Sequence, residues 1–161
     1  MTSATKSKDL KVGDKAPPFT LPVDGGGKLS LSSLKRQAVV LYFYPKDDTS
    51  GCTAEAIQFT NSAKAFENAG ATVVGVSKDS PASHEKFKAK HGLSLTLASD
   101  EDTEIAKTYG VWVEKSIYGR RYMGMERATF LIDGKGVIRQ IWRKVKVPGH
   151  VAEVLAAVHT L

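Results

Sequence analysis

The sequence predicts an α/β fold in which helices flank a central mixed β-sheet, with a β-hairpin at the N-terminus. Two nearly continuous apolar runs, at residues 38–45 and 71–77, are typical of strands buried on both faces of a sheet. A segment with apolar residues at helical spacing follows the first run. Nearer the C-terminus, two strand-like segments surround a Gly-Lys-Gly turn at 134–136, which predicts an antiparallel hairpin.

In the first half of the chain, the segments 18–23 (PFTLPV) and 28–31 (KLSL) flank residues 24–27 (DGGG), a turn suited to a hairpin. The triple glycine does not precede a helix, which argues against a phosphate-binding loop. The run at 38–45 lacks alternation and predicts a central strand. From 53 to 68 the apolar residues follow helical spacing, and a glycine at position 70 ends this helix.

The second half predicts a regular succession of strands and helices. These are a strand over 71–77, a helix over 81–91 with proline in its first turn, a strand over 95–98, a helix over 102–109, strands over 127–133 and 137–142, and a helix over 151–158. The last helix places valine or leucine at i, i+3, i+4 and i+7. This order of elements is that of an α/β sandwich.

Length and composition are those of one globular domain. The 161 residues predict a single domain over 1–161, with the polar residues 1–8 as a flexible tail. The 42% hydrophobic and 25% charged content excludes a disordered chain. No apolar run approaches the roughly 20 residues that cross a bilayer, and none forms a signal-peptide core. We therefore expect a cytoplasmic protein that does not bind membranes.

The formal net charge of +6 raises the question of nucleic-acid binding. The densest basic stretch, residues 139–146, alternates with apolar residues and reads as a strand. Arg139 and Arg143 would then point to one face, and Lys144 and Lys146 to the other. Because this arrangement splits the charge, and because no recognition motif accompanies it, we expect no specific nucleic-acid partner.

The histidines do not form a metal site. His84 and His91 share one face of the helix predicted over 81–91, but they are two turns apart, about 10.5 Å along the axis. That is too far for both to bind one metal ion, and we expect partly buried or surface imidazoles. The sequence thus predicts no metal and no cofactor.

Cys52 is the only cysteine, so it cannot form an intrachain disulfide, a CxxC pair or a zinc site by itself. It is either a small buried hydrophobe or a reactive thiol. It follows a strand and a short loop and opens the next helix, where unpaired N–H groups and the helix dipole stabilise a thiolate over a thiol. Gly51 permits the close approach of a substrate. This context favours the reactive thiol.

The segment 42–56 (YFYPKDDTSGCTAEA) contains Pro45, Thr49 and Cys52 in the pattern PxxxTxxC and closely resembles the active-site signature of peroxiredoxins. In detail it is similar to the bacterioferritin comigratory protein, or peroxiredoxin Q, subgroup. Segments such as GDKAPPFTLP, VVGVSKDSPASHEKF, ERATFLID and VKVPGHVAEVL extend the resemblance over nearly the whole chain. The resemblance implies a thioredoxin-like fold and thiol-dependent reduction of hydrogen peroxide and organic hydroperoxides.

The resemblance also implies roles for individual residues. Cys52 would be the peroxidatic nucleophile, and the Thr49 hydroxyl and the Cys52 N–H would hold the peroxide. Pro45 would make the entrance of the loop rigid. Arg127, in ERATFLID, would stabilise the thiolate and the developing oxyanion, although without the resemblance it reads as an ordinary surface arginine. Glu55 would orient Arg127 or the loop, the alternative being a solvated glutamate in the first turn.

Two positions depart from the family pattern. Ser50 stands where proline is common, so the loop should be less rigid, and the serine could cap the helix. No second cysteine is present, either at Ile57 or near Phe87 and Lys88, which implies a one-cysteine member. The expected partners are a hydroperoxide substrate and an external thiol reductant (a thioredoxin, a glutaredoxin or a small thiol), and the expected state is a monomer or weak homodimer. Two alternatives stay open: a non-enzymatic redox sensor and a structural thioredoxin-like binding domain.

Overall fold

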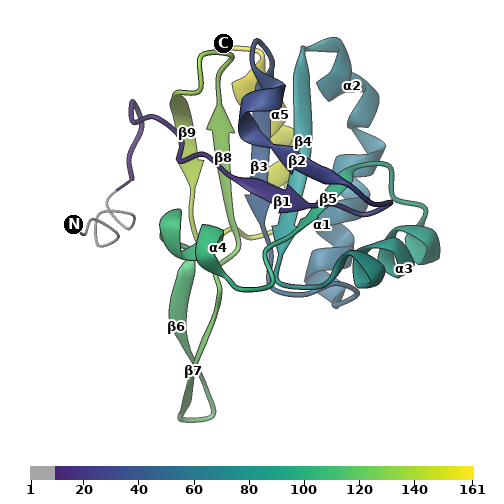
Figure 1. Ribbon diagram of the computed structural model, residues 1–161, viewed down its shortest axis with the longest axis vertical. Helices are drawn as coiled ribbons and strands as arrows, with labels where there is room; N and C mark the ends of the chain where they lie inside the picture. Colours follow the sequence, from purple (N-terminus) through teal and green to yellow (C-terminus); the bar gives the residue numbers. More distant parts are fainter. Residues whose placement is uncertain (1–9) are drawn as a thin grey trace.

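The computed structural model describes residues 10–161, and the tail predicted over 1–8 lies outside these residues. Its centre is a five-stranded sheet with the strand order β5-β4-β3-β8-β9 (Figure 1). The first three strands pair in parallel, β8 runs antiparallel to β3, and β9 runs antiparallel to β8, so the predicted mixed sheet is confirmed. The strands are β3 (Ala38–Phe43), β4 (Ala71–Ser77), β5 (Thr96–Ser99), β8 (Ala128–Ile132) and β9 (Ile138–Trp142).

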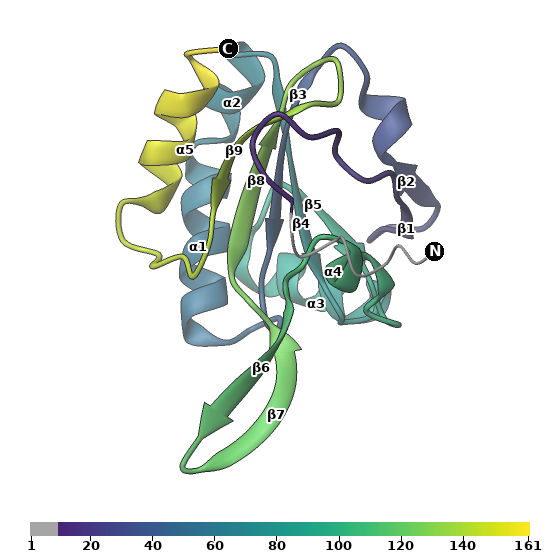
Figure 2. The same ribbon diagram turned by 90° about the vertical axis from the view of Figure 1, so that its left-hand side faces the viewer.

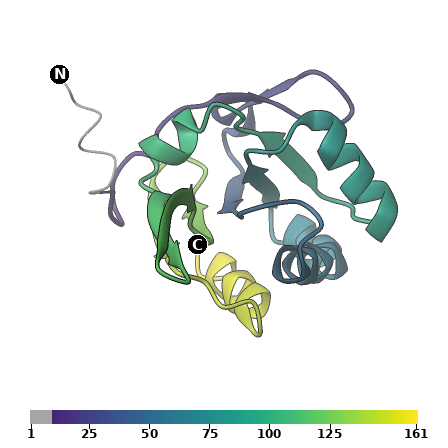
Figure 3. The same ribbon diagram turned by 90° about the horizontal axis from the view of Figure 1, so that it is seen from below.

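The two faces of the sheet are covered by different elements (Figure 2). One face carries α1 (Ser50–Asn61), α2 (Ala63–Asn68) and α5 (His150–Val158). The other carries the predicted hairpin of β1 (Thr20–Pro22) and β2 (Lys28–Ser30), a 3₁₀ turn (Leu31–Leu34) and α4 (Glu104–Thr108). The remaining helix, α3 (Pro81–His91), packs beside β5 at the sheet edge (Figure 3). Between residues 10 and 161, no helix is long and apolar enough to cross a membrane.

The central strand explains the unbroken apolar run in the sequence. Successive side chains of β3 point to opposite faces of the sheet, and both faces are covered. Val39, Leu41 and Phe43 belong to the core under the hairpin and α4, whereas Val40 and Tyr42 belong to the core under α1, α2 and α5. All five side chains are at most 1% exposed.

Three sequence-based expectations are wrong in detail. The helix predicted over 53–68 begins earlier, at Ser50, and is interrupted at Ser62, whose N–H is shared between the carbonyls of Gln58 and Phe59. His84 is not a surface imidazole, because its side chain is 0% exposed. The basic stretch at 139–146 is not one strand: β9 ends at Trp142, and the backbone then turns away, with a φ of 48° at Lys144. The strand alternation from which the division of its charges between two faces was expected therefore ends at Trp142.

The sequence analysis missed a second hairpin, formed by β6 (Trp112–Ile117) and β7 (Arg120–Met125). It projects from the body of the molecule as a two-stranded ribbon (Figures 1 and 2). Tyr118 and Gly119 form its tip, both with positive φ. Most of its side chains contact solvent, so neither an apolar run nor a clear alternation marks it in the sequence. The base of this hairpin leads directly into Arg127.

Candidate active site

Cys52 lies in the first turn of α1, directly after the loop that leaves β3. The helix begins at Ser50, with Thr49 as the extended residue before it (φ −95°, ψ 157°). The N–H groups of a helix's first turn have no acceptor within the helix, and they carry the positive end of its dipole. Cys52 is the third helical residue and its side chain is only 2% exposed. The thiol is therefore recessed at the positive end of α1, as the sequence predicts.

The loop before the helix presents Thr49 to solvent and keeps Pro45 half-buried at the end of β3. The Thr49 hydroxyl donates a hydrogen bond to the Lys46 carbonyl over 2.9 Å, which leaves its lone pairs free to accept one from a ligand. Ser50 is the first helical residue rather than the cap, because the residue with extended geometry before the helix is Thr49. The expectation that Ser50 caps the helix is thus wrong.

Arg127 reaches the thiol from just before β8, 75 residues away in sequence. Its Nη2 lies 3.4 Å from Cys52 Sγ, and its Nη1 lies 2.7 Å from Glu55 Oε1. Gly51 makes this approach possible, because a Cβ at that position would lie 3.1 Å from Nη2. The Arg127 side chain is 17% exposed and that of Glu55 is 0% exposed. Neither residue is the solvated surface group of the alternative interpretation.

Burial dominates the electrostatics of this ion pair. Burial raises the pKa of Glu55 to about 7, although the charge and hydrogen bond of Arg127 lower it. For Arg127 burial has the opposite effect, but the charges of Cys52 and Glu55 outweigh it and raise the guanidinium pKa. Within the described part of the chain, Glu55 Oε2 and the hydroxyl of the buried Tyr42 have no hydrogen-bond partner. Arg127 is thus a permanent cation beside a carboxyl that binds a proton near neutrality.

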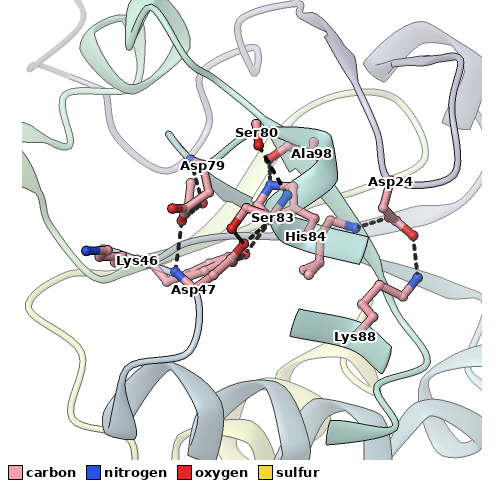
Figure 4. Close-up of polar contacts among 12 residues, drawn as sticks. Asp24, Lys46, Asp47, Asp79, Ser80, Ser83, His84, Lys88 and Ala98 are labelled. Carbon is pink, nitrogen blue, oxygen red and sulfur yellow. Dashed lines mark hydrogen bonds and ion pairs between the residues drawn. The ribbon is translucent and has the colours of Figure 1, made fainter. Parts of the chain in front are cut away.

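A second polar cluster beside the loop was missed by the sequence analysis (Figure 4). The Asp47 carboxylate accepts hydrogen bonds from Tyr44, Ser83 and His84, over 2.6, 2.8 and 2.7 Å. The sequence analysis expected His84 to be a partly buried or surface imidazole and assigned it no partner. The only local signal was an unexplained histidine on the face of α3 that also carries Phe87. Its partner, 37 residues earlier, could not be identified from the sequence.

Peroxiredoxins of the thioredoxin fold superpose on this chain. Xanthomonas campestris peroxiredoxin Q superposes with a TM-score of 0.84 at 40% identity, over 97% of this chain and 93% of that chain. A serine mutant of Xylella fastidiosa PrxQ gives 0.89 at 41% identity, over 94% and 96% of the two chains. The fold, together with a thiol held between a helix N-terminus and a guanidinium, defines a peroxiredoxin, a thiol-dependent peroxidase.

The sequence comparisons agree. A putative peroxiredoxin bcp of Coxiella burnetii is 54% identical over 146 residues, which cover 91% of this chain and 97% of that protein. Peroxiredoxin Bcp of Bacillus subtilis is 47% identical over 91% and 93% of the two chains. The model of the AhpC/TSA family matches residues 12–141, and the chain belongs to this family. The resemblance to the Bcp and peroxiredoxin Q subgroup is confirmed, and neither a sensor nor a binding domain finds support.

Proposed function

We propose that Cys52 is the peroxidatic nucleophile, acting on hydrogen peroxide and organic hydroperoxides. The observation that carries this assignment is the contact of 3.4 Å between Cys52 Sγ and Arg127 Nη2 at the N-terminus of α1. A cation and a helix N-terminus both favour the thiolate, which is the nucleophilic form. The bacterioferritin comigratory protein of Xanthomonas campestris, 40% identical, is described as having alkyl peroxide reduction activity, which supports this choice of substrates.

In the first step, the Cys52 thiolate attacks one peroxide oxygen. The S–O bond forms, the O–O bond breaks, and the leaving oxygen takes a proton to become water or an alcohol, while Cys52 becomes a sulfenic acid. Negative charge moves from the Cys52 sulfur to the leaving oxygen, and the Arg127 guanidinium stabilises the charge on both atoms. The Thr49 hydroxyl accepts a hydrogen bond from the peroxide O–H, since its own proton is donated to Lys46. Glu55 holds Arg127 in this orientation.

The second step uses an external thiol, since the chain has no other cysteine. The thiol displaces water from the sulfenic acid and forms a mixed disulfide, and a second thiol releases Cys52. A thioredoxin, a glutaredoxin or a small thiol can supply these electrons. We further propose a single domain over 1–161 that works in the cytoplasm as a monomer or weak homodimer. Because Cys52 is only 2% exposed, a disulfide with a second copy is geometrically poor, which favours an external reductant.

The Cys52→Ser variant tests the proposal. Peroxide consumption with excess thiol is measured for the wild-type chain and the variant, and circular dichroism verifies the fold of each. The variant is expected to lose all thiol-dependent turnover, since serine differs by one atom but has no thiolate at neutral pH. Substantial turnover in the folded variant would show that Cys52 is not the nucleophile.

A further inference from the structure

The loop that carries Thr49 is held against α3 by a buried polar cluster that the proposed chemistry does not use. We define the Asp47 clamp as Asp47 together with its three side-chain donors: Tyr44, Ser83 and His84 (Figure 4). Asp47 lies two residues before Thr49, at the middle of the loop. Its side chain is buried, with an exposed fraction of 3%. Removing a carboxylate from water costs free energy, so the burial of Asp47 in an active-site loop calls for a structural explanation.

His84 is the best-buried member of the clamp. Its Nδ1 lies 2.7 Å from Asp47 Oδ2 and its Nε2 lies 3.0 Å from the Ala98 carbonyl oxygen. Both neighbours are oxygen acceptors, so each ring nitrogen lies within hydrogen-bond distance of an oxygen. His84 therefore ties the loop to the end of β5 through two hydrogen bonds. Burial would raise the pKa of Asp47, but the hydrogen bonds from His84, Tyr44 and Ser83 outweigh it and lower that pKa.

The backbone of the loop is fixed from a second direction. The Asp47 N–H donates to Asp79 Oδ2 over 2.8 Å, and the Ser77 hydroxyl donates to the same oxygen over 2.7 Å. The next residue, Asp48, forms an exposed ion pair with Lys90 and lies 2.8 Å from His91 Nε2, both on α3. The loop is thus attached to the turn after β4 and to α3 as well as to its own ends.

The clamp connects to the peroxide-binding hydroxyl through one short path. The Thr49 hydroxyl donates to the carbonyl of Lys46, the residue immediately before Asp47. A displacement of Asp47 therefore moves the acceptor that orients Thr49, whereas Arg127 and Cys52 are held by β8 and α1. We infer that His84 is a positioning residue for the peroxidase reaction, which acts through Asp47 to aim the Thr49 hydroxyl at the peroxide. This inference rests on the proposed function.

Two substitutions of His84 separate this role from general stability. In His84→Asn the side-chain amide nitrogen takes the place of Nδ1 and keeps the bond to Asp47. In His84→Gln it takes the place of Nε2 and keeps the bond to Ala98 instead. Both variants are therefore polar replacements that each lose one buried hydrogen bond. We expect sulfenic acid formation to be about tenfold slower in the Gln variant than in the Asn variant, the scale of a misplaced substrate-binding group.

Sulfenic acid formation is measured by quenched flow, trapping with dimedone and mass spectrometry. Alkylation of Cys52 by iodoacetamide is the second readout, because it depends on the thiolate but not on Thr49. We expect alkylation rates of the two variants to agree within about twofold, since Arg127 and the N-terminus of α1 are untouched. Equal peroxide rates in the two variants, or alkylation that slows in parallel with the peroxide reaction, would overturn the inference.

A second pair of variants covers the case in which the His84 variants do not fold. Ser83 donates its hydroxyl to Asp47, whereas Ser80, at the N-terminus of the same helix, accepts from the Ser83 N–H and makes no hydrogen bond to the Asp47 carboxylate. Ser83→Ala is expected to slow the peroxide reaction about threefold relative to Ser80→Ala, and equal rates would refute the positioning role. A failure of the proposed function would be seen in a different experiment, as peroxide turnover by the Cys52→Ser variant.

Discussion

The proton on Glu55 makes the stability of the protein depend on pH in a direction unusual for a carboxylate in an ion pair. Burial raises the pKa of Glu55 from 4.5 to about 7, and the pairing with Arg127 at 2.7 Å only partly opposes this. The folded chain keeps this proton at pH values where the unfolded chain has released it. At about 1.4 kcal/mol per pH unit, the interval from 4.5 to about 7 corresponds to about 3 kcal/mol.

The protonated carboxyl therefore contributes its full stabilisation below pH 4.5, and this contribution is lost as the pH rises through about 7. Glutamine is neutral at every pH and keeps the hydrogen bond to Arg127, so Glu55→Gln is the matched reference. Both proteins should also carry Cys52→Ser, which removes the titration of the thiol. The free energy of unfolding of the protein that retains Glu55, minus that of the Glu55→Gln variant, should fall by about 3 kcal/mol between pH 4.5 and 8.

Urea unfolding at half-unit steps of pH, followed by circular dichroism, measures this difference. A matched comparison of Glu153 with Glu153→Gln, at an exposed position on α5, shows what the same exchange does away from the site. A difference between the Glu55 protein and its Glu55→Gln variant that stays constant from pH 4.5 to 8 would refute the assignment of the proton. A difference that rises with pH would mean that Arg127 outweighs burial.

Three further outcomes are expected. Arg127→Ala should slow the peroxide reaction at least about 100-fold. Arg127→Lys should restore the rate only in part, because one ammonium cannot replace two guanidinium nitrogens that contact Glu55 and Cys52 separately. The rates are measured by rapid mixing, and an unchanged rate would assign the role to another cation. Gly51→Ala should slow the same reaction about tenfold, because its Cβ would lie 3.1 Å from Arg127 Nη2 and displace the guanidinium, and a wild-type rate would contradict this. Mass spectrometry should find Cys52 with one added oxygen after one equivalent of peroxide and with two after excess, and added thiol should remove only the first. Complete conversion to a Cys52-linked dimer, with no sulfenic acid that thiols can trap, would overturn this scheme.

Much of the fold could be predicted because its elements have strong local patterns. The run at 38–45 and the span Pro81–His91 of α3 illustrate this, since the period of the apolar residues and a proline at the first position are local signals. The hairpin of β6 and β7 has no such signal, because most of its side chains are exposed on both faces. The break at Ser62 was equally invisible, because the helical spacing continues across it.

The sequence by itself determined the part of the site that lies within one segment. Pro45, Thr49 and Cys52 follow one another along a strand end, a loop and a helix start, so their placement depends only on local structure. The single cysteine is also read directly from the sequence, and it is the reason for proposing an external thiol reductant.

Only the tertiary structure showed how distant residues complete the site: the sequence indicated Arg127 through the family resemblance alone, and it did not indicate the partner of His84. Arg127 meets Cys52 and Glu55 across more than 70 residues because β8 pairs with β3, and that pairing brings the start of β8 beside the end of β3. His84 meets Asp47 because α3 packs beside β5. Such contacts depend on strand order and on the burial it creates, which no local period encodes. The same burial raises the pKa of Glu55 to about 7, which a solvated carboxylate would not show.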